Sequence, residues 1–289
     1  MRVIGNALPA PCIKMSALFR LAGMVRPCPA VEKSFSTRLF STGAPKRPLP
    51  SNFFKQPSPT QQQIRSYPGG FGPARQYAAN KFLLNGFLGI NVAVFGYSLY
   101  VTEQARGGYL DSFRKYHRNM TMNLREFKNG AYWQPLTSMF AHGNIMHIAF
   151  NMFTFWSLGG MLCRLPVTPG QFTLIVLGSG LAGSLFWLGQ RQMQEQAGAP
   201  PNQRALGFSG ALMGAVTVVA CFVPRNKVGL FGVIPVPLWA CALGYAFYDG
   251  YYLNSENTRV AHAGHLGGMA FGLAYYFLKL RRLQYPGSI

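Results

Sequence analysis

A series of apolar runs after residue 80, each about long enough to cross a lipid bilayer, limits the folds that are open to this chain. A membrane-spanning helix needs about 20 predominantly apolar residues, and none of the runs alternates as a half-buried strand does. Pro235 and Pro237 interrupt one run, which a membrane helix tolerates where its neighbours satisfy the freed carbonyls. The sequence therefore predicts an all-α, polytopic membrane protein with six transmembrane helices, near residues 82–101, 136–162, 171–189, 207–223, 230–248 and 262–280.

The charge composition excludes a plain soluble domain. Charged residues make up only 12% of the 289 residues, although the formal net charge is +20, and so few charges could hardly solvate a soluble surface of this size. Eleven of the 27 Lys and Arg residues precede residue 80, where Glu32 is the only acid. The basic excess is typical of a targeting segment rather than a nucleic-acid-binding face, so we expect no nucleic acid or nucleotide partner.

The first 40 residues have the composition of a mitochondrial transit peptide, because residues 1–40 are poor in acids and contain several Arg and Ser residues. Arg20 and Arg26 interrupt the apolar stretch that a secretory signal would need. The stretch from Arg38 to Ser41 resembles a matrix-peptidase cleavage pattern, which predicts a mature start near Ser41. A disordered basic tail is the alternative.

The rest of the chain divides into three parts. Residues 41–80 are rich in Pro and Gln and cannot bury enough apolar surface to fold, which predicts a disordered linker with no additional helix before the first run. The six predicted helices form one domain over residues 81–283, and residues 284–289 are a C-terminal tail.

The acidic residues predict how the helices are oriented. If the chain crosses the membrane six times, loops 102–135, 190–206 and 249–261 face one compartment and contain every acid beyond Glu32. The opposite side then carries Lys and Arg near the helix ends, and such a side usually faces the compartment from which the chain is inserted. We therefore expect both termini in the mitochondrial matrix.

Three polar residues stand at similar depth in alternate helices. His147, Ser209 and His265 each lie in the first part of a predicted helix that begins on the acidic-loop side. Polar and ionisable side chains are costly inside a membrane, so each is a candidate functional residue. A serine hydroxyl becomes a useful nucleophile when an imidazole takes its proton, which makes Ser209 and His265 a candidate catalytic pair.

Neighbouring residues could complete this site. His147 and Asn151 lie one helical turn apart and could donate, with the Ser209 backbone N–H, to a developing oxyanion. No Asp or Glu falls inside a predicted helix, so the expected unit is a Ser-His dyad without a third member. Small residues allow the helices that carry the dyad to pack closely, and these are Gly207, Gly210, Gly214, Gly268 and Gly272.

Each of these polar residues also permits a different interpretation. A serine between glycines is commonly a packing residue, and a membrane histidine can be structural, a proton relay, or a metal or haem ligand. His142 and His262 are interpreted as local hydrogen-bonding or shaping residues, although their proximity to His147 and His265 leaves a four-histidine metal or haem site open. The chain lacks HExxH and CxxC spacings, so we expect no metal and no cofactor.

Together these residues resemble the rhomboid family of intramembrane serine proteases over about residues 81–283. The family's GxSG corresponds to Gly207–Gly210, its HxxxN to His147 and Asn151, and its HxxGxxxG to the segment from His265 to Gly272. The resemblance implies that Ser209 is the nucleophile, that His265 is the base, and that His147 and Asn151 support the oxyanion. His142 and Trp133 also match recurrent family positions, whereas Gln134 and Gly264 replace the usual Arg and Ala.

With the transit-like N-terminus, the chain is most similar to a mitochondrial rhomboid of fungal type. That resemblance implies cleavage of single-span proteins of the inner membrane, with the active site open to the intermembrane space. A dynamin-like fusion GTPase and a cytochrome c peroxidase precursor are the substrates it suggests. Two alternatives are a catalytically silent relative that binds membrane helices as a chaperone or adaptor, and a transporter, which would call for an acid in the helices or an inverted repeat.

Overall fold

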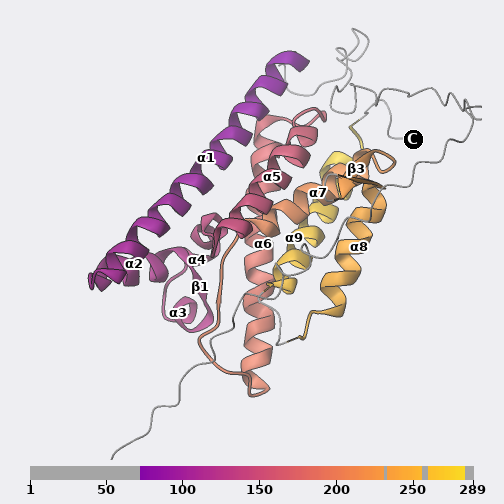
Figure 1. The fold of residues 1–289 in the computed structure, drawn as a ribbon. Coiled ribbons are helices and arrows are strands. Elements are labelled where there is room, and N and C mark those ends of the chain that lie inside the picture. Colours follow the sequence, from indigo (N-terminus) through magenta and orange to yellow (C-terminus); the bar gives the residue numbers. More distant parts are fainter. Residues whose placement is uncertain (1–71, 231–232, 256–259, 284–289) are drawn as a thin grey trace, which may run out of the picture. The chain divides into compact units, whose positions relative to one another are not determined.

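The structure is a computed structural model that describes residues 72–230, 233–255 and 260–283 (Figure 1). The predictions for residues 1–40, for most of the linker and for residues 284–289 therefore concern segments outside the described residues. The predicted all-α architecture is confirmed, with six long helices among the described residues. Its long helices are α1 (Pro73–Arg106), α5 (Ile145–Leu162), α6 (Pro169–Gln196), α7 (Ser209–Phe222), α8 (Leu238–Tyr251) and α9 (His262–Tyr275), which continues as a π-helical turn, η3 (Tyr276–Leu280).

The helices differ in whether they are long enough to span a bilayer. By length and composition, α1, α5 and α6 could each cross a membrane, and α7 is a shorter apolar helix. The 14 residues of α7 extend about 21 Å, less than the hydrocarbon thickness of about 30 Å. The serine at its first position can therefore lie below the membrane surface, with non-helical chain leading to it.

The first helix begins earlier than its hydropathy predicts. α1 starts at Pro73, so residues 73–80, which are linker by composition, are helical. Pro73 fits the first turn of a helix, where its missing N–H is not needed. The side-chain amides of Gln76 and Asn80 are buried and donate to the Val167 carbonyl at 2.7 and 2.9 Å. These polar residues are thus stabilised by a tertiary contact that a hydropathy pattern does not reveal.

The second apolar run is divided, and the prediction of one helix over 136–162 is wrong at its start. Two short elements occupy the start of the run, α4 (Gln134–Thr137) and the 3₁₀ turn η2 (Ser138–Phe140). The loop before it contains α2 (Leu110–Met120), β1 (Met122–Asn123) and α3 (Leu124–Lys128). α5 begins only at Ile145, because Asn144 caps it by accepting a hydrogen bond from the His147 backbone N–H at 2.9 Å. His142 consequently lies before the helix.

The prediction of one helix over the fifth run, 230–248, is also wrong in part, because a pair of antiparallel strands replaces the beginning of that helix. β3 (Lys227–Leu230) pairs antiparallel with β4 (Ile234–Pro237), with Gly229 opposite Pro235. Each proline lacks an N–H and disfavours helical backbone in the residue before it, so the chain stays extended until α8 begins after Pro237. α8 then extends to Tyr251, and Asp249, which is predicted in a loop, lies inside it.

The core is formed by helices packed through aromatic rings and through small residues. The rings of Phe87, Phe155 and Phe208 contact one another between α1, α5 and the start of α7. α6, α7 and α9 pack side by side (Figure 1), and a Cβ at Gly268 would overlap the carbonyl oxygen of Gly210. Such close backbone approach is how membrane helices gain packing energy without a hydrophobic driving force.

This contact generates a stability prediction. Gly268→Ala should lower the free energy of unfolding by about 1–3 kcal/mol, because the added methyl group must displace backbone of α7. Gly86→Ala on α1, where a Cβ meets no atom within 4 Å, is the matched control and should be neutral or slightly stabilising. Thermal unfolding of both variants in the same detergent measures the difference, and equal Tm values would contradict the close contact.

Candidate functional site

Ser209 and His265 meet where two helices begin. Ser209 is the first residue of α7, and His265 lies in the first turn of α9. The Ser209 Oγ and the His265 Nε2 are 2.8 Å apart, within hydrogen-bond distance. The structure thus brings together the two residues that the sequence predicts as a nucleophile and its base.

The segment before Ser209 is held in an unusual backbone conformation. Gly207 has φ = 131°, in the region that side chains disfavour, and its N–H donates to the Ser138 carbonyl at 3.0 Å. A Cβ at Gly207 would lie 2.8 Å from His147 Cε1 and 2.9 Å from His147 Nε2. Gly207 therefore lets the His147 ring approach the segment before Ser209, a more specific role than the general packing predicted for it.

Asn151 accompanies His147 on α5. The two residues are one helical turn apart, which places them on the same face of the helix. Asn151 is buried, and among the described residues its Nδ2 has no hydrogen-bond partner. A buried amide donor without a partner is costly, so this atom is available to an acceptor that the protein itself does not provide.

A partly open cleft adjoins Ser209 and His265. Gly183, Trp187 and Gly264 line its wall, and β1 contributes Met122 from the loop between α1 and α5. Ser209 therefore faces a partly open cleft rather than packed side chains, which a site that admits a polypeptide requires.

Asp249 is the main site residue that the sequence did not predict. It is 1% exposed, and its Oδ1 lies 3.0 Å and its Oδ2 3.1 Å from the His265 Nδ1. The expectation that no helix carries an acid is thus wrong, because α8 continues three residues beyond the apolar run that defined it. The position of Asp249 directly after that run, 16 residues before His265, could have indicated an acid near the site.

His142 and His262 each lie beside one of the histidines already described. The ring centroids of His142 and His147 are 5.0 Å apart, whereas those of His262 and His265 are 6.4 Å apart. The His262 Nδ1 lies 2.6 Å from the Asp249 Oδ1, so this residue contacts the same carboxylate as His265. His262 thus forms a hydrogen bond, as predicted, and its partner is the carboxylate that also contacts His265.

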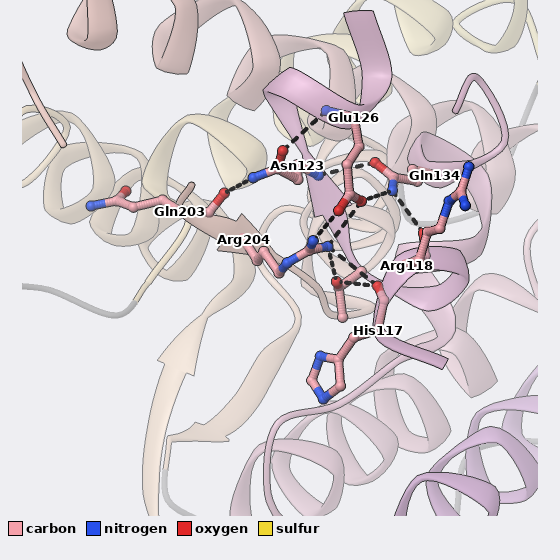
Figure 2. A network of polar contacts seen from close by, with 8 residues as sticks. His117, Arg118, Asn123, Glu126, Gln134, Gln203 and Arg204 are labelled. Carbon is pink, nitrogen blue, oxygen red and sulfur yellow. Dashed lines mark hydrogen bonds and ion pairs between the residues drawn. The ribbon is translucent and has the colours of Figure 1, made fainter. Parts of the chain in front are cut away.

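A polar network outside the long helices anchors the chain that leads to Ser209. β1 pairs antiparallel with β2 (Arg204–Ala205), four residues before Ser209. Figure 2 shows Arg204 forming an ion pair with Glu126 on α3, and one of its N–H groups also donates to the Thr121 hydroxyl at 2.9 Å. The strand before Ser209 is thereby tied to the loop between α1 and α5.

Gln134 belongs to this network. Its side chain is fully buried, donates to the Glu126 Oε2 at 2.6 Å and to the Arg118 carbonyl at 2.7 Å, and accepts from the Asn123 N–H at 3.0 Å (Figure 2). An amide can donate and accept at once, whereas Arg can only donate. Gln134 therefore joins α3 and β1 through a single side chain.

Comparison with known proteins relates the sequence to one family. A family model described as the Rhomboid domain matches residues 129–282. Rhomboid protein 1, mitochondrial, of Saccharomyces cerevisiae is 29% identical over 217 residues, covering 72% of this chain and 58% of the yeast protein. RHOMBOID-like protein 12, mitochondrial, of Arabidopsis thaliana is 28% identical over 181 residues, 57% of this chain and 53% of that protein.

A bacterial relative is similar over a shorter region. Rhomboid protease GluP of Bacillus subtilis is 27% identical over 144 residues, 50% of this chain and 25% of the bacterial protein. The chain thus spans little more than half the length of the two mitochondrial relatives and a quarter of the bacterial one.

The ion pair between Glu126 and Arg204 predicts a pH-dependent stability. Burial alone would raise the pKa of Glu126, but hydrogen bonds from Arg204 and Gln134 and the charge of Arg204 lower it overall. A lowered pKa in the folded state stabilises the protein above the unfolded value, about 4.3, and this stabilisation is lost as pH falls through the folded value. Glu126→Gln should therefore cost about 1 kcal/mol at pH 7 and progressively less in acid.

The measurement is thermal unfolding of the wild type and Glu126→Gln from pH 7 down to about 3.5, a range that contains the ordinary Glu pKa. Glu103→Gln is the matched control, because Glu103 pairs with Arg106 at 3.0 Å on an exposed part of α1. A Tm difference for Glu126→Gln that stays constant over this range would contradict the ion pair.

Proposed function

Because this chain belongs to the rhomboid family, we propose that it is an intramembrane serine endopeptidase that uses Ser209 and His265. The observation that carries the proposal is the distance of 2.8 Å between the Ser209 Oγ and the His265 Nε2 beside a cleft. An imidazole at this distance can accept the hydroxyl proton as the oxygen attacks a carbonyl. The activity named for the bacterial relative, Rhomboid protease GluP, supports the same reaction class.

The chemistry proceeds by acyl transfer. Ser209 Oγ attacks the scissile carbonyl while its proton moves to the His265 Nε2, which then delivers that proton to the leaving amine. The Ser209 backbone N–H, His147 and Asn151 would donate to the oxyanion, and the unpartnered Nδ2 of Asn151 is suited to this role. Water then hydrolyses the acyl-enzyme with His265 as base.

The proposed substrates are single-span membrane proteins. A peptide bond within a helix has a hydrogen-bonded, shielded carbonyl, so the substrate must unwind locally, and helix-weakening Gly or Pro residues would favour this. The two mitochondrial relatives and the candidate membrane helices support a location in a mitochondrial membrane. A dynamin-like fusion GTPase and a cytochrome c peroxidase precursor are the substrates we would test first.

We also propose the orientation that the charges suggest. Both termini would face the matrix, and the cleft beside Ser209 would open toward the intermembrane space, where the acidic loops would lie. A catalytically silent chaperone or adaptor is the alternative. The presence of both Ser209 and His265 at hydrogen-bond distance favours catalysis.

Removal of either dyad residue should abolish turnover. Ser209→Ala and His265→Ala should each reduce cleavage of a fluorogenic transmembrane peptide by at least about 10³-fold, because nucleophile and base act as one unit. Both should also prevent labelling by a serine-directed fluorophosphonate. Ser157→Ala, an exposed serine on α5, and His117→Ala on α2 are matched controls that should retain activity. A wild type inert to several peptides and to the probe would favour the non-catalytic alternative.

The oxyanion assignment predicts a different kinetic signature. Asn151→Ala and His147→Ala should each lower kcat about 10²–10³-fold with little change in KM, because their donors act on charge that develops in the transition state. Ile145→Ala, on the exposed surface of the same helix, is the control. Unchanged kcat in both variants would remove these residues from the proposed mechanism.

A further inference from the structure

A buried carboxylate lies between two imidazole rings behind the proposed dyad. Asp249 on α8 is 1% exposed and contacts both histidines of α9 through their Nδ1 atoms: His262 at 2.6 Å, and His265 at 3.0 and 3.1 Å. An ionised carboxyl group buried in this way is costly unless hydrogen bonds compensate it. The two rings can supply those bonds.

The direction of these hydrogen bonds follows from the chemistry of the groups. An ionised carboxylate can only accept, so each contacting Nδ1 must carry a hydrogen. The neutral His265 ring then has no hydrogen on Nε2, the atom 2.8 Å from the Ser209 Oγ. This is the tautomer that can accept a proton from the serine, whereas the opposite tautomer would present a hydrogen to it.

His262 is placed to hold the carboxylate itself. Its ring is 2% exposed and stacks on the Tyr252 ring with centroids 5.9 Å apart, and the Tyr248 ring lies 5.7 Å away. The orientation of the ring is thus restricted by aromatic contacts while its Nδ1 faces the Asp249 Oδ1. This leaves the Asp249 Oδ2 directed to His265 alone among the described residues.

We propose that Asp249 is a positioning residue that fixes the Nδ1–H tautomer and the orientation of His265, and that His262 holds Asp249 in place. The inference rests on the proposed function, because the tautomer matters for a base that acts on Ser209. When the serine proton moves to Nε2, the ring becomes an imidazolium with both hydrogens, and the adjacent carboxylate stabilises that charge. Asp249 stays ionised throughout, and no proton passes to it.

The direct test is Asp249→Asn. The new amide can donate to the His265 Nδ1, which favours the tautomer with its hydrogen on Nε2, and kcat should fall about 10²–10⁴-fold while KM stays within about twofold. Asp249→Ala should be less harmful, because it removes the carboxylate without imposing the wrong tautomer. Asp111→Asn, fully exposed on α2, is the matched control and should retain wild-type kinetics.

A second measurement determines the tautomer of His265 independently of enzyme activity. In protein labelled with ¹⁵N-histidine and carrying Ser209→Ala, the His265 signals, identified by comparison with His265→Ala, should show hydrogen on Nδ1 and a bare Nε2. Asp249→Asn in the same background should reverse this assignment. His262→Phe retains the aromatic contacts but removes the donor, and it should lower kcat about 10-fold without reversing the tautomer.

The outcomes separate the two proposals. If the wild type neither cleaves peptides nor reacts with the serine probe, the proposed protease function fails, whatever the tautomer. If the wild type cleaves but Asp249→Asn keeps kcat within about threefold, the positioning role of Asp249 is wrong and the protease function stands. If Asp249→Asn does not fold, the Ser209→Ala spectrum decides, and a hydrogen on His265 Nε2 in that spectrum overturns the inference.

Discussion

The close approach of α7 and α9 sets both the packing of the helices and the geometry of the site. Gly210 and Gly268 lack the atoms that would separate the two helices, and the residues that form the proposed dyad lie directly beside this contact, one before Gly210 and one a turn before Gly268. A methyl group added at Gly268 would overlap the Gly210 carbonyl oxygen, and moving the helices apart to relieve this overlap would lengthen the 2.8 Å distance between the Ser209 Oγ and the His265 Nε2. In a membrane, where apolar surface gains little by leaving lipid, packing of this kind is a main source of helix association. Stability and site geometry therefore have the same origin.

Contacts outside the long helices complete the positioning of Ser209, the proposed nucleophile. The ion pair of Arg204 with Glu126, the buried amide of Gln134 and the pairing of β1 with β2 tie the chain before Ser209 to the loop between α1 and α5. The Gly207 N–H, bound to the Ser138 carbonyl, adds an anchor closer to the serine. Because α7 is short, the non-helical chain before it has no helical hydrogen bonds of its own, and these contacts satisfy it instead.

The sequence allowed the six long helices and the meeting of Ser209 with His265 to be predicted, since both depend on long apolar runs and on spacing within a helix. It did not allow the position of Asp249 to be predicted, because a hydropathy pattern ends a helix at the first charge, whereas two imidazoles compensate this one. The start of α1 was also missed, because Gln76 and Asn80 are polar by composition and are compensated only by their hydrogen bonds to the Val167 carbonyl. The pair of antiparallel strands at 227–237 was missed because apolar composition cannot distinguish a buried helix from a strand over so few residues; its prolines were the better signal.

A structure of the protein after reaction with a fluorophosphonate would show whether Ser209 is an activated nucleophile. We expect a covalent bond from the Ser209 Oγ to phosphorus, with a phosphoryl oxygen within hydrogen-bond distance of the Ser209 N–H and of His147 or Asn151, and with His265 still bound to Asp249. An adduct on another residue, or a folded and unmodified protein after prolonged exposure, would contradict the assignment of Ser209 to that role.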